Sequence, residues 1–228
     1  MPAIAHTLED VRRRIARAAL AAGRNPAEIE LLAVSKTKPA TMIREAWGAG
    51  QQAFGENYLQ DALPKIHALI DLPITWHYIG RIQSNKIRDI ARHFTWVHGL
   101  DRLKHSRRLS DQRPETLPPL NCCIQVNLSG ETSKGGIPVD ALEELALAVN
   151  ELPGLCLRGL MSMPDPASPR ETQTAVFRDL ADLRRQLEKQ TGLNLDTLSM
   201  GMSSDLEPAI AAGSTLVRVG TDIFGARK

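Results

Sequence analysis

The feature of this sequence that most constrains its fold is a repeated alternation of short apolar runs with longer amphipathic segments. The short runs are typical of strands buried on both faces, and most of the longer segments carry apolar residues at helical spacing. Eight short runs occur, at residues 31–34, 53–54, 76–79, 96–97, 122–127, 157–160, 197–200 and 216–219. Dividing the 228 residues among eight units leaves about 28 residues for each, a normal size for a strand with its helix. We therefore expect an α/β fold, a closed (β/α)8 TIM barrel, with an open doubly wound sheet as the alternative.

The two ends of the chain fit the barrel. Only nine residues follow the eighth run, which is too few for a full outer helix. Residues 7–22 have the pattern of an amphipathic helix, and its apolar residues are Leu8, Val11, Ile15 and Ala19. We expect this extra N-terminal helix to fill the gap in the outer ring. Because no proline- or glycine-rich linker divides the chain, we predict a single domain over residues 1–228.

Composition excludes several classes of protein. An apolar fraction of 43% and a charged fraction of 24% exclude disorder as the main state. A formal net charge of +2 argues against a nucleic-acid partner, which usually needs a strongly basic surface. No apolar run approaches the roughly 18 residues that span a bilayer, and the N-terminus lacks a signal pattern, so no membrane partner is expected. The three cysteines show no metal-ligand spacing, and we expect a cytoplasmic protein with reduced thiols and no metal.

In a (β/α)8 barrel the functional site lies at the C-terminal ends of the strands, and Lys36 follows the first of them directly. Leu32, Val34 and Lys36 share one face of that strand. A lysine in the barrel mouth would be partly desolvated, which favours the neutral amine that attacks an aldehyde and forms a Schiff base. The alternative is a lysine that extends to solvent. Lys38 lies on the same face, but Pro39 marks the loop and places Lys38 nearer the rim.

The last two predicted strands end in turns that suit an anion. Gly220 lets backbone amides approach an anion closely, and Thr221 adds a hydroxyl donor at the start of a short helix. Ser203 occupies a similar turn after the seventh strand, and barrels often bind phosphate at this location. Arg218 lies on the last strand, where its side chain either points into the barrel or forms an ion pair outside it. A lysine that captures aldehydes, beside a phosphate site, suggests pyridoxal phosphate (PLP) as the cofactor.

Six sequence blocks then resemble the YggS/PROSC family of pyridoxal phosphate homeostasis proteins along nearly the whole chain. They are LAVSKTKP at 32–39, FGENY at 54–58, WHYIGRIQSNK at 76–86, GLMSM at 159–163, LSMGMS at 198–203 and RVGTDIFG at 218–225. The resemblance implies a single barrel like the N-terminal domain of alanine racemase, a fold type III PLP-binding barrel. One departure is VHGLDR at 97–102, where Gly99 stands at a position expected to hold a larger residue, which would loosen the end of the fourth strand.

The same resemblance implies a set of cofactor-binding residues. Lys36 would carry the Schiff base, and Arg218 would face the pyridine nitrogen. The phosphate would be held by Ser203, Gly220 and Thr221. The residues implied to line the ring and phosphate region are Asn57, His77 and Met200.

Two observations bear on whether such a protein is an enzyme. An arginine keeps its proton, so a pyridine nitrogen facing Arg218 stays unprotonated and the cofactor becomes a poor electron sink. In the related racemases, a tyrosine from a second domain supplies the second base, and this chain ends at Lys228 without room for that domain. Its tyrosines, Tyr58 and Tyr78, both belong to strand-end blocks. We therefore predict a monomeric, non-catalytic protein of intracellular PLP homeostasis, which stores, buffers or delivers the cofactor with PLP-dependent apo-enzymes as recipients.

Two alternatives remain open at this point. The first is a small fold type III PLP enzyme, such as an amino-acid racemase, with water or Tyr78 as its second base. The second is a phosphate-binding barrel that does not bind PLP. Lys38 and Lys134 are candidates for cofactor exchange, with solvated surface lysines as the other interpretation.

Overall fold

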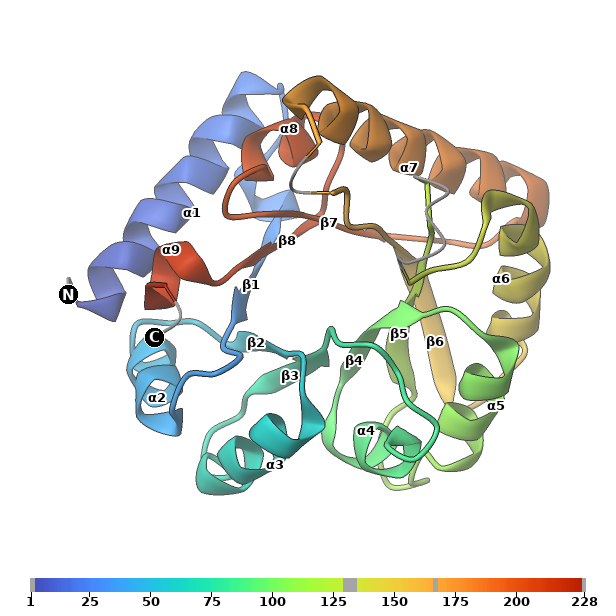
Figure 1. The fold of residues 1–228 in the computed structure, drawn as a ribbon, viewed down its shortest axis with the longest axis horizontal. Helices are drawn as coiled ribbons and strands as arrows, with labels where there is room; N and C mark the ends of the chain where they lie inside the picture. The colour runs from blue at the N-terminus through green and yellow to red at the C-terminus, as the bar shows by residue number, and fades with distance from the viewer. Residues whose placement is uncertain (1–2, 129–134, 166–167, 227–228) are drawn as a thin grey trace.

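Eight parallel strands close into a barrel in which each strand pairs with its neighbours in chain order (Figure 1). The computed structural model describes residues 3–128, 135–165 and 168–226. The barrel closes where β1 (Glu30–Val34) pairs in parallel with β8 (Leu216–Val219), in a register that places Leu32 opposite Arg218. The prediction of a closed barrel is therefore confirmed, and the open doubly wound sheet is excluded.

All eight predicted strands are present, with ends that shift by a few residues. The strands between β1 and β8 are β2 (Ala53–Glu56), β3 (Thr75–Tyr78), β4 (Trp96–Leu100), β5 (Leu120–Gln125), β6 (Leu155–Met161) and β7 (Thr197–Met202). The fifth strand ends at Gln125, two residues before the predicted end at Asn127. Beyond it, Val126 pairs with Ile137 in an isolated bridge.

Helices surround the barrel and bury its outer face (Figure 1). They are α1 (Ile4–Ala21), α2 (Ala40–Gly48), α3 (Leu59–Ala68), α4 (Ile87–His93), α5 (Leu103–Asp111), α6 (Leu142–Asn150), α7 (Arg170–Thr191), α8 (Leu206–Ala211) and the short α9 (Thr221–Phe224). One large apolar core lies between the strands and these helices, and smaller apolar clusters lie apart from it. One of those clusters contains Leu32, and another contains Trp96 and Met161. Within the described ranges, no helix is both long and apolar enough to cross a membrane.

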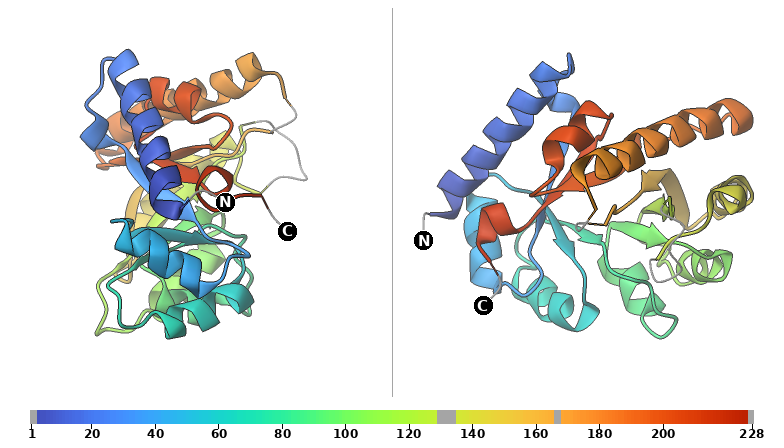
Figure 2. Two further views of the ribbon diagram at one scale, coloured as in Figure 1. Left: turned by 90° about the vertical axis from the view of Figure 1, so that its left-hand side faces the viewer. Right: turned by 45° about the horizontal axis from the view of Figure 1, so that its top comes forward.

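The N-terminal helix completes the outer ring, as predicted. It begins at Ile4, three residues before the predicted start, and its buried residues are Ile4, Leu8, Val11, Ile15 and Ala19. Figures 1 and 2 show α1 beside α8 and α9 on the outside of the barrel. The Thr7 hydroxyl donates to the carbonyl oxygen of Ile223 in α9 at 2.9 Å. The first helix of the chain is thereby tied to its last.

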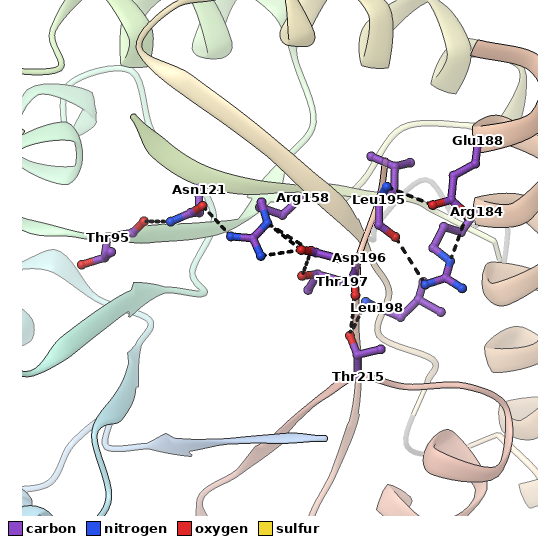
Figure 3. Close-up of polar contacts among 10 residues, drawn as sticks. All are labelled: Thr95, Asn121, Arg158, Arg184, Glu188, Leu195, Asp196, Thr197, Leu198 and Thr215. Carbon is purple, nitrogen blue, oxygen red and sulfur yellow. Dashed lines mark hydrogen bonds and ion pairs between the residues drawn. The ribbon is translucent and has the colours of Figure 1, made fainter. Parts of the chain in front are cut away.

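Polar side chains tie strands together at the N-terminal end of the barrel (Figure 3). Arg158 of β6 donates from Nε to Asp196 Oδ1 at 3.0 Å and from Nη1 to Asn121 Oδ1 of β5 at 3.0 Å. The Arg158 guanidinium also lies 5.1 Å from the centre of the Trp96 ring. These contacts link β4, β5 and β6 to the start of β7 at the end opposite the predicted site.

The end of the fourth strand is tightly packed, contrary to the expectation from the sequence. A Cβ atom at Gly99 would lie 3.0 Å from the carbonyl oxygen of Gly80 and 3.4 Å from Gln125 Oε1. A larger residue would press on the backbone of the neighbouring loop, so the glycine makes this strand end closely packed rather than loose.

Candidate functional site

A cavity of about 480 Å³ lies at the C-terminal ends of the strands, where the sequence predicts the site. The ends of β1, β2, β3, β6, β7 and β8 contribute to it. Its lining residues are Val34, Lys36, Lys38, Asn57, Ile79, Met161, Met163, Met202, Ser203, Ser204, Arg218, Gly220, Thr221, Asp222 and Gly225. Six of the eight predicted site residues therefore line one cavity, and His77 and Met200 are not among them.

Lys36 reaches the cavity because of the alternation along β1. Leu32 is fully buried, and Val34 and Lys36, on the same face, line the cavity above it. The Lys36 side chain is half-buried rather than extended into solvent. A primary amine at this depth is placed where a bound carbonyl compound could meet it.

Lys38 is not a solvated surface lysine. Its Nζ atom donates to three carbonyl oxygens, of Phe224, Gly225 and Ala226, at 3.0 Å each. These carbonyls lie at the C-terminal end of α9, where a cation is electrostatically favoured. Through these hydrogen bonds, Lys38 holds the end of α9 and the residues that follow it at the rim of the cavity. Lys134, the other lysine considered for cofactor exchange, lies outside the described residues.

The turns after β7 and β8 supply backbone and hydroxyl hydrogen-bond donors to the cavity. Gly220 directly precedes α9, which begins at Thr221, and the first amides of a helix have no carbonyl partner within it. A Cβ atom at Gly220 would lie 3.1 Å from the carbonyl oxygen of Val34, so the turn passes this strand at a distance that favours glycine. Ser203 and Thr221 add hydroxyl groups. The arrangement suits a compact anion such as a phosphate group.

Arg218 is a buried cation that also faces the cavity. Its Nη1 donates to the carbonyl oxygen and to Oγ of Ser199, both at 2.6 Å, and its Nη2 donates to the carbonyl oxygen of Ser162 at 3.0 Å. These acceptors are neutral oxygen atoms. Burial lowers the pKa of Arg218 to about 10, which leaves the guanidinium protonated at neutral pH. The alternative of an ion pair outside the barrel is therefore wrong.

His77 lies away from the cavity, in a chain of polar groups that crosses the barrel. Its Nδ1 is 2.9 Å from Nε2 of His98, and Nδ1 of His98 is 2.7 Å from Oγ of Ser199. The His77 ring stacks on Trp96, with 5.3 Å between ring centres. Burial lowers the pKa of His77 to about 3, so this imidazole is neutral. This series of hydrogen-bonded groups runs from His77 to Arg218. Of its two ends, Arg218 lines the cavity and His77 does not.

Met200 also differs from its predicted place. It is fully buried in the large apolar core outside the barrel, whereas Met202 lines the cavity. Pairing between β7 and β8 is irregular between Ser199 and Met202, and Gly201 has a φ of +94°. This irregularity turns Met202 toward the cavity, so the expectation that Met200 lines it is corrected.

Reasoning from the sequence missed His98 and Ser199. Each is a polar residue within a mostly apolar strand. That pattern was the available signal. The hydrogen bonds that link His98 to Ser199 and Ser199 to Arg218 could not be found from this pattern, because His98 and Ser199 are 101 residues apart in the sequence.

Comparison with known proteins agrees with this geometry. The sequence matches the alanine racemase N-terminal domain family over residues 4–228. The pyridoxal phosphate homeostasis protein of Pseudomonas aeruginosa is 58% identical over 227 residues, which cover 100% of this chain and 97% of that protein. The protein of the same name from Escherichia coli K12 is 55% identical over 227 residues, or 98% of this chain and 97% of that protein. The structure of PipY from Synechococcus elongatus with PLP bound has a TM-score of 0.86 at 37% identity, and the match covers 97% of this chain and 100% of that one.

The fold and the cavity therefore define a barrel of the alanine racemase N-terminal class. Within that class, the chain belongs to the family of pyridoxal phosphate homeostasis proteins.

Proposed function

We propose that this protein binds pyridoxal phosphate in the cavity and holds it reversibly on Lys36, as part of PLP homeostasis. The observation that carries the proposal is the meeting of Lys36, Arg218 and the Gly220–Thr221 turn in one cavity. A primary amine, a buried guanidinium and a set of anion donors match the aldehyde, the ring nitrogen and the phosphate of this cofactor. The PLP-bound relative PipY supports the same assignment.

Further observations support the fit of the cavity to PLP. The Oδ1 atom of Asn57 is buried and has no hydrogen-bond partner among the described residues, although Asn57 lines the cavity. A buried acceptor without a partner is costly, and a polar ligand would satisfy it. Gly220 lets its turn pass close to Val34, and the amides that follow it lie at the start of α9, an arrangement that suits an anion. Ser203, Gly220 and Thr221 would hold the phosphate, and Asn57 would contact the polar edge of the ligand.

Lys36 and Arg218 have different roles in binding the cofactor. When bound, PLP supplies an aldehyde carbon that condenses with a primary amine to form an imine and release water. Lys36 supplies that amine. Arg218 keeps its proton at neutral pH and can only donate, so it favours an unprotonated ring nitrogen and weakens the electron-withdrawing power on which PLP enzymes depend.

The positions of the tyrosines support a carrier rather than a racemase. The Tyr78 hydroxyl donates to the carbonyl oxygen of Arg81 at 3.1 Å, and its ring packs edge-on against Phe94. Tyr58 is exposed. Neither tyrosine is among the residues that line the cavity. A racemase needs a base on each face of the substrate, and Lys36 alone would serve one face.

The test is to trap the cofactor on the protein. Purified protein incubated with PLP and then reduced with borohydride should carry a pyridoxyl adduct on Lys36, detected by peptide mass spectrometry. Lys36→Ala should lose the adduct and bind PLP about tenfold more weakly or worse, because the covalent link is gone. Lys104→Ala, which removes an exposed lysine on α5, should behave like the natural protein.

Two outcomes would contradict this proposal, and a third would narrow it to storage and buffering. An unmodified Lys36 after reduction would favour a phosphate-binding barrel without PLP. Turnover of an amino acid well above the rate of free PLP would favour the racemase. Failure of the loaded protein to activate a PLP-dependent apo-enzyme faster than its cofactor dissociates would contradict direct delivery, leaving storage and buffering.

We also propose that the protein acts as a monomer. Light scattering of the loaded and cofactor-free protein against the chain mass of 25.0 kDa tests this expectation. A mass of twice that value at working concentration would contradict it.

A further inference from the structure

The backbone on both sides of Lys36 is bonded to an ion network that lies behind it. On the N-terminal side, the carbonyl oxygen of Ser35 accepts a hydrogen bond from Lys65 Nζ at 3.0 Å. On the C-terminal side, the amide of Thr37 donates to Asp61 Oδ2 at 2.8 Å. Both partners belong to α3, so one helix holds the residues that flank the amine.

The network itself is buried and closely connected. Lys65 Nζ lies 2.9 Å from Glu56 Oε1, 3.0 Å from Glu56 Oε2 and 2.7 Å from Asp61 Oδ2. The Ser35 hydroxyl donates to Glu56 Oε1 at 2.6 Å. Glu56 is fully buried and Lys65 is 6% exposed. Buried ion pairs often contribute little to stability compared with apolar packing, so stability alone does not explain why this network is present.

The conformation of Thr37 provides that reason. Among the described residues, Thr37 is the only one other than glycine with a positive φ, at +64°. A β-branched residue in this region is strained and stays there only when its surroundings hold it. The bond from its amide to Asp61 is such a restraint. The strained residue comes directly after the amine that faces the cavity, so the bend at Thr37 sets the direction in which Lys36 leaves β1.

We propose that Asp61 and Lys65 are positioning residues that hold Lys36 in the orientation needed to capture an aldehyde. They act through Thr37 and Ser35 and do not touch the ligand. This inference rests on the proposed function. It adds that the reactivity of Lys36 is set by a salt-bridged helix outside the cavity, because a reacting group must be held near its productive geometry.

The test removes Asp61, which is partly exposed and whose loss leaves the Glu56–Lys65 pair in place. Asp61→Ala should slow borohydride trapping of PLP on Lys36 by about tenfold, while Asp61→Asn, which keeps an oxygen acceptor, should restore most of the rate. In the cofactor-free protein, the Thr37 amide should exchange with solvent faster in Asp61→Ala. Asp71→Ala is the matched control, because it removes a surface partner of Arg44 at 2.7 Å and contacts nothing near Lys36.

A second variant separates positioning from general loss of stability. Glycine adopts a positive φ without steric cost, so Thr37→Gly should partly restore trapping in the Asp61→Ala protein. Trapping at the natural rate in Asp61→Ala would overturn the inference, and so would a loss that neither Asp61→Asn nor Thr37→Gly repairs. If the natural protein itself forms no adduct on Lys36, the proposed function fails first, and the two failures are thereby distinguished.

Discussion

At the scale of single residues, the interior of this barrel depends on side chains kept in one protonation state. His77 and His98 are fully buried, and burial lowers the pKa of each below its ordinary value. Arg218, at the other end of the same polar chain, keeps its charge. One cation is therefore joined to two neutral rings, and a second positive charge beside it would be strongly unfavourable.

This arrangement predicts that acid destabilises the protein. His77 has a pKa of about 3 when folded and about 6.5 when unfolded, so between these values the unfolded chain binds a proton that the folded chain does not. Stability contributed by neutral His77 is complete above pH 6.5 and declines as the pH falls. From pH 6.5 to pH 5 the free energy of unfolding should fall by about 2 kcal/mol from His77, with His98 acting in the same direction.

Urea unfolding of the natural protein and of His77→Gln at about pH 7.5 and pH 5 checks this expectation. The substitution should reduce the loss of stability at the lower pH, even if it lowers stability at both. An identical pH dependence in the two proteins would show that His77 is not the responsible group.

At the scale of elements, the N-terminal helix α1 also bonds to the two turns that form the predicted phosphate site. Arg14 of α1 donates from Nε to Glu207 of α8 at 2.9 Å, from Nη1 to Asp222 of α9 at 2.5 Å, and from Nη2 to the carbonyl oxygen of Ser203 at 3.1 Å. Ser203 and Asp222 both line the cavity. One side chain on the outer helix thus links the two turns that form the predicted phosphate site.

We predict that Arg14→Ala weakens PLP binding several-fold and lowers the free energy of unfolding by about 1 kcal/mol, a modest value because these ion pairs are partly exposed to solvent. Arg13→Ala is the matched control, since within the described ranges Arg13 forms an ion pair only with the exposed Asp10 on the same helix. Absorbance titration with PLP and thermal unfolding measure the two effects. Equal effects of the two substitutions would show that the link across α1, α8 and α9 is unimportant.

At the scale of the whole molecule, closure of the barrel requires close approach of neighbouring strands. A Cβ atom at Gly159 of β6 would lie 1.7 Å from the carbonyl oxygen of Thr197, its register partner on β7. The two strands could not pair there with any larger residue. Closure at this seam therefore depends on a missing side chain.

Gly159→Ala should lower the free energy of unfolding by about 3 kcal/mol or more, because the strands must separate to admit a methyl group. Gly48→Ala is a suitable control. It lies at the end of α2 with nothing within 4 Å of the added atom, and should leave stability unchanged or raise it by up to about 1 kcal/mol. Chemical denaturation of both variants measures the difference, and comparable stabilities would contradict the argument.

The order of elements was predictable from the sequence because it depends on local periodicity. Apolar runs such as residues 31–34 mark strands, and the stripe from Leu8 to Ala19 marks the outer helix. Lys36, Asn57, Ser203, Arg218, Gly220 and Thr221 were placed at one barrel mouth for the same reason: parallel strands in a barrel all end on the same side. Met200 was expected at the cavity from the family resemblance alone, and it points away from the cavity because its neighbour Ser199 faces the barrel interior and bonds Arg218.

The barrel, its outer helix and the side of the barrel on which the site lies therefore follow from the order of residues along the chain. Which polar groups meet depends on the folded barrel. The hydrogen bond from His98 to Ser199 crosses the barrel between residues that are 101 positions apart in the sequence. The hydrogen bonds from Lys38 to the carbonyl oxygens at the end of α9 join residues 186 or more positions apart. Periodicity reports which way a side chain points from its own strand. The partner that it meets depends on strand tilt, register and closure, which are properties of the assembled barrel.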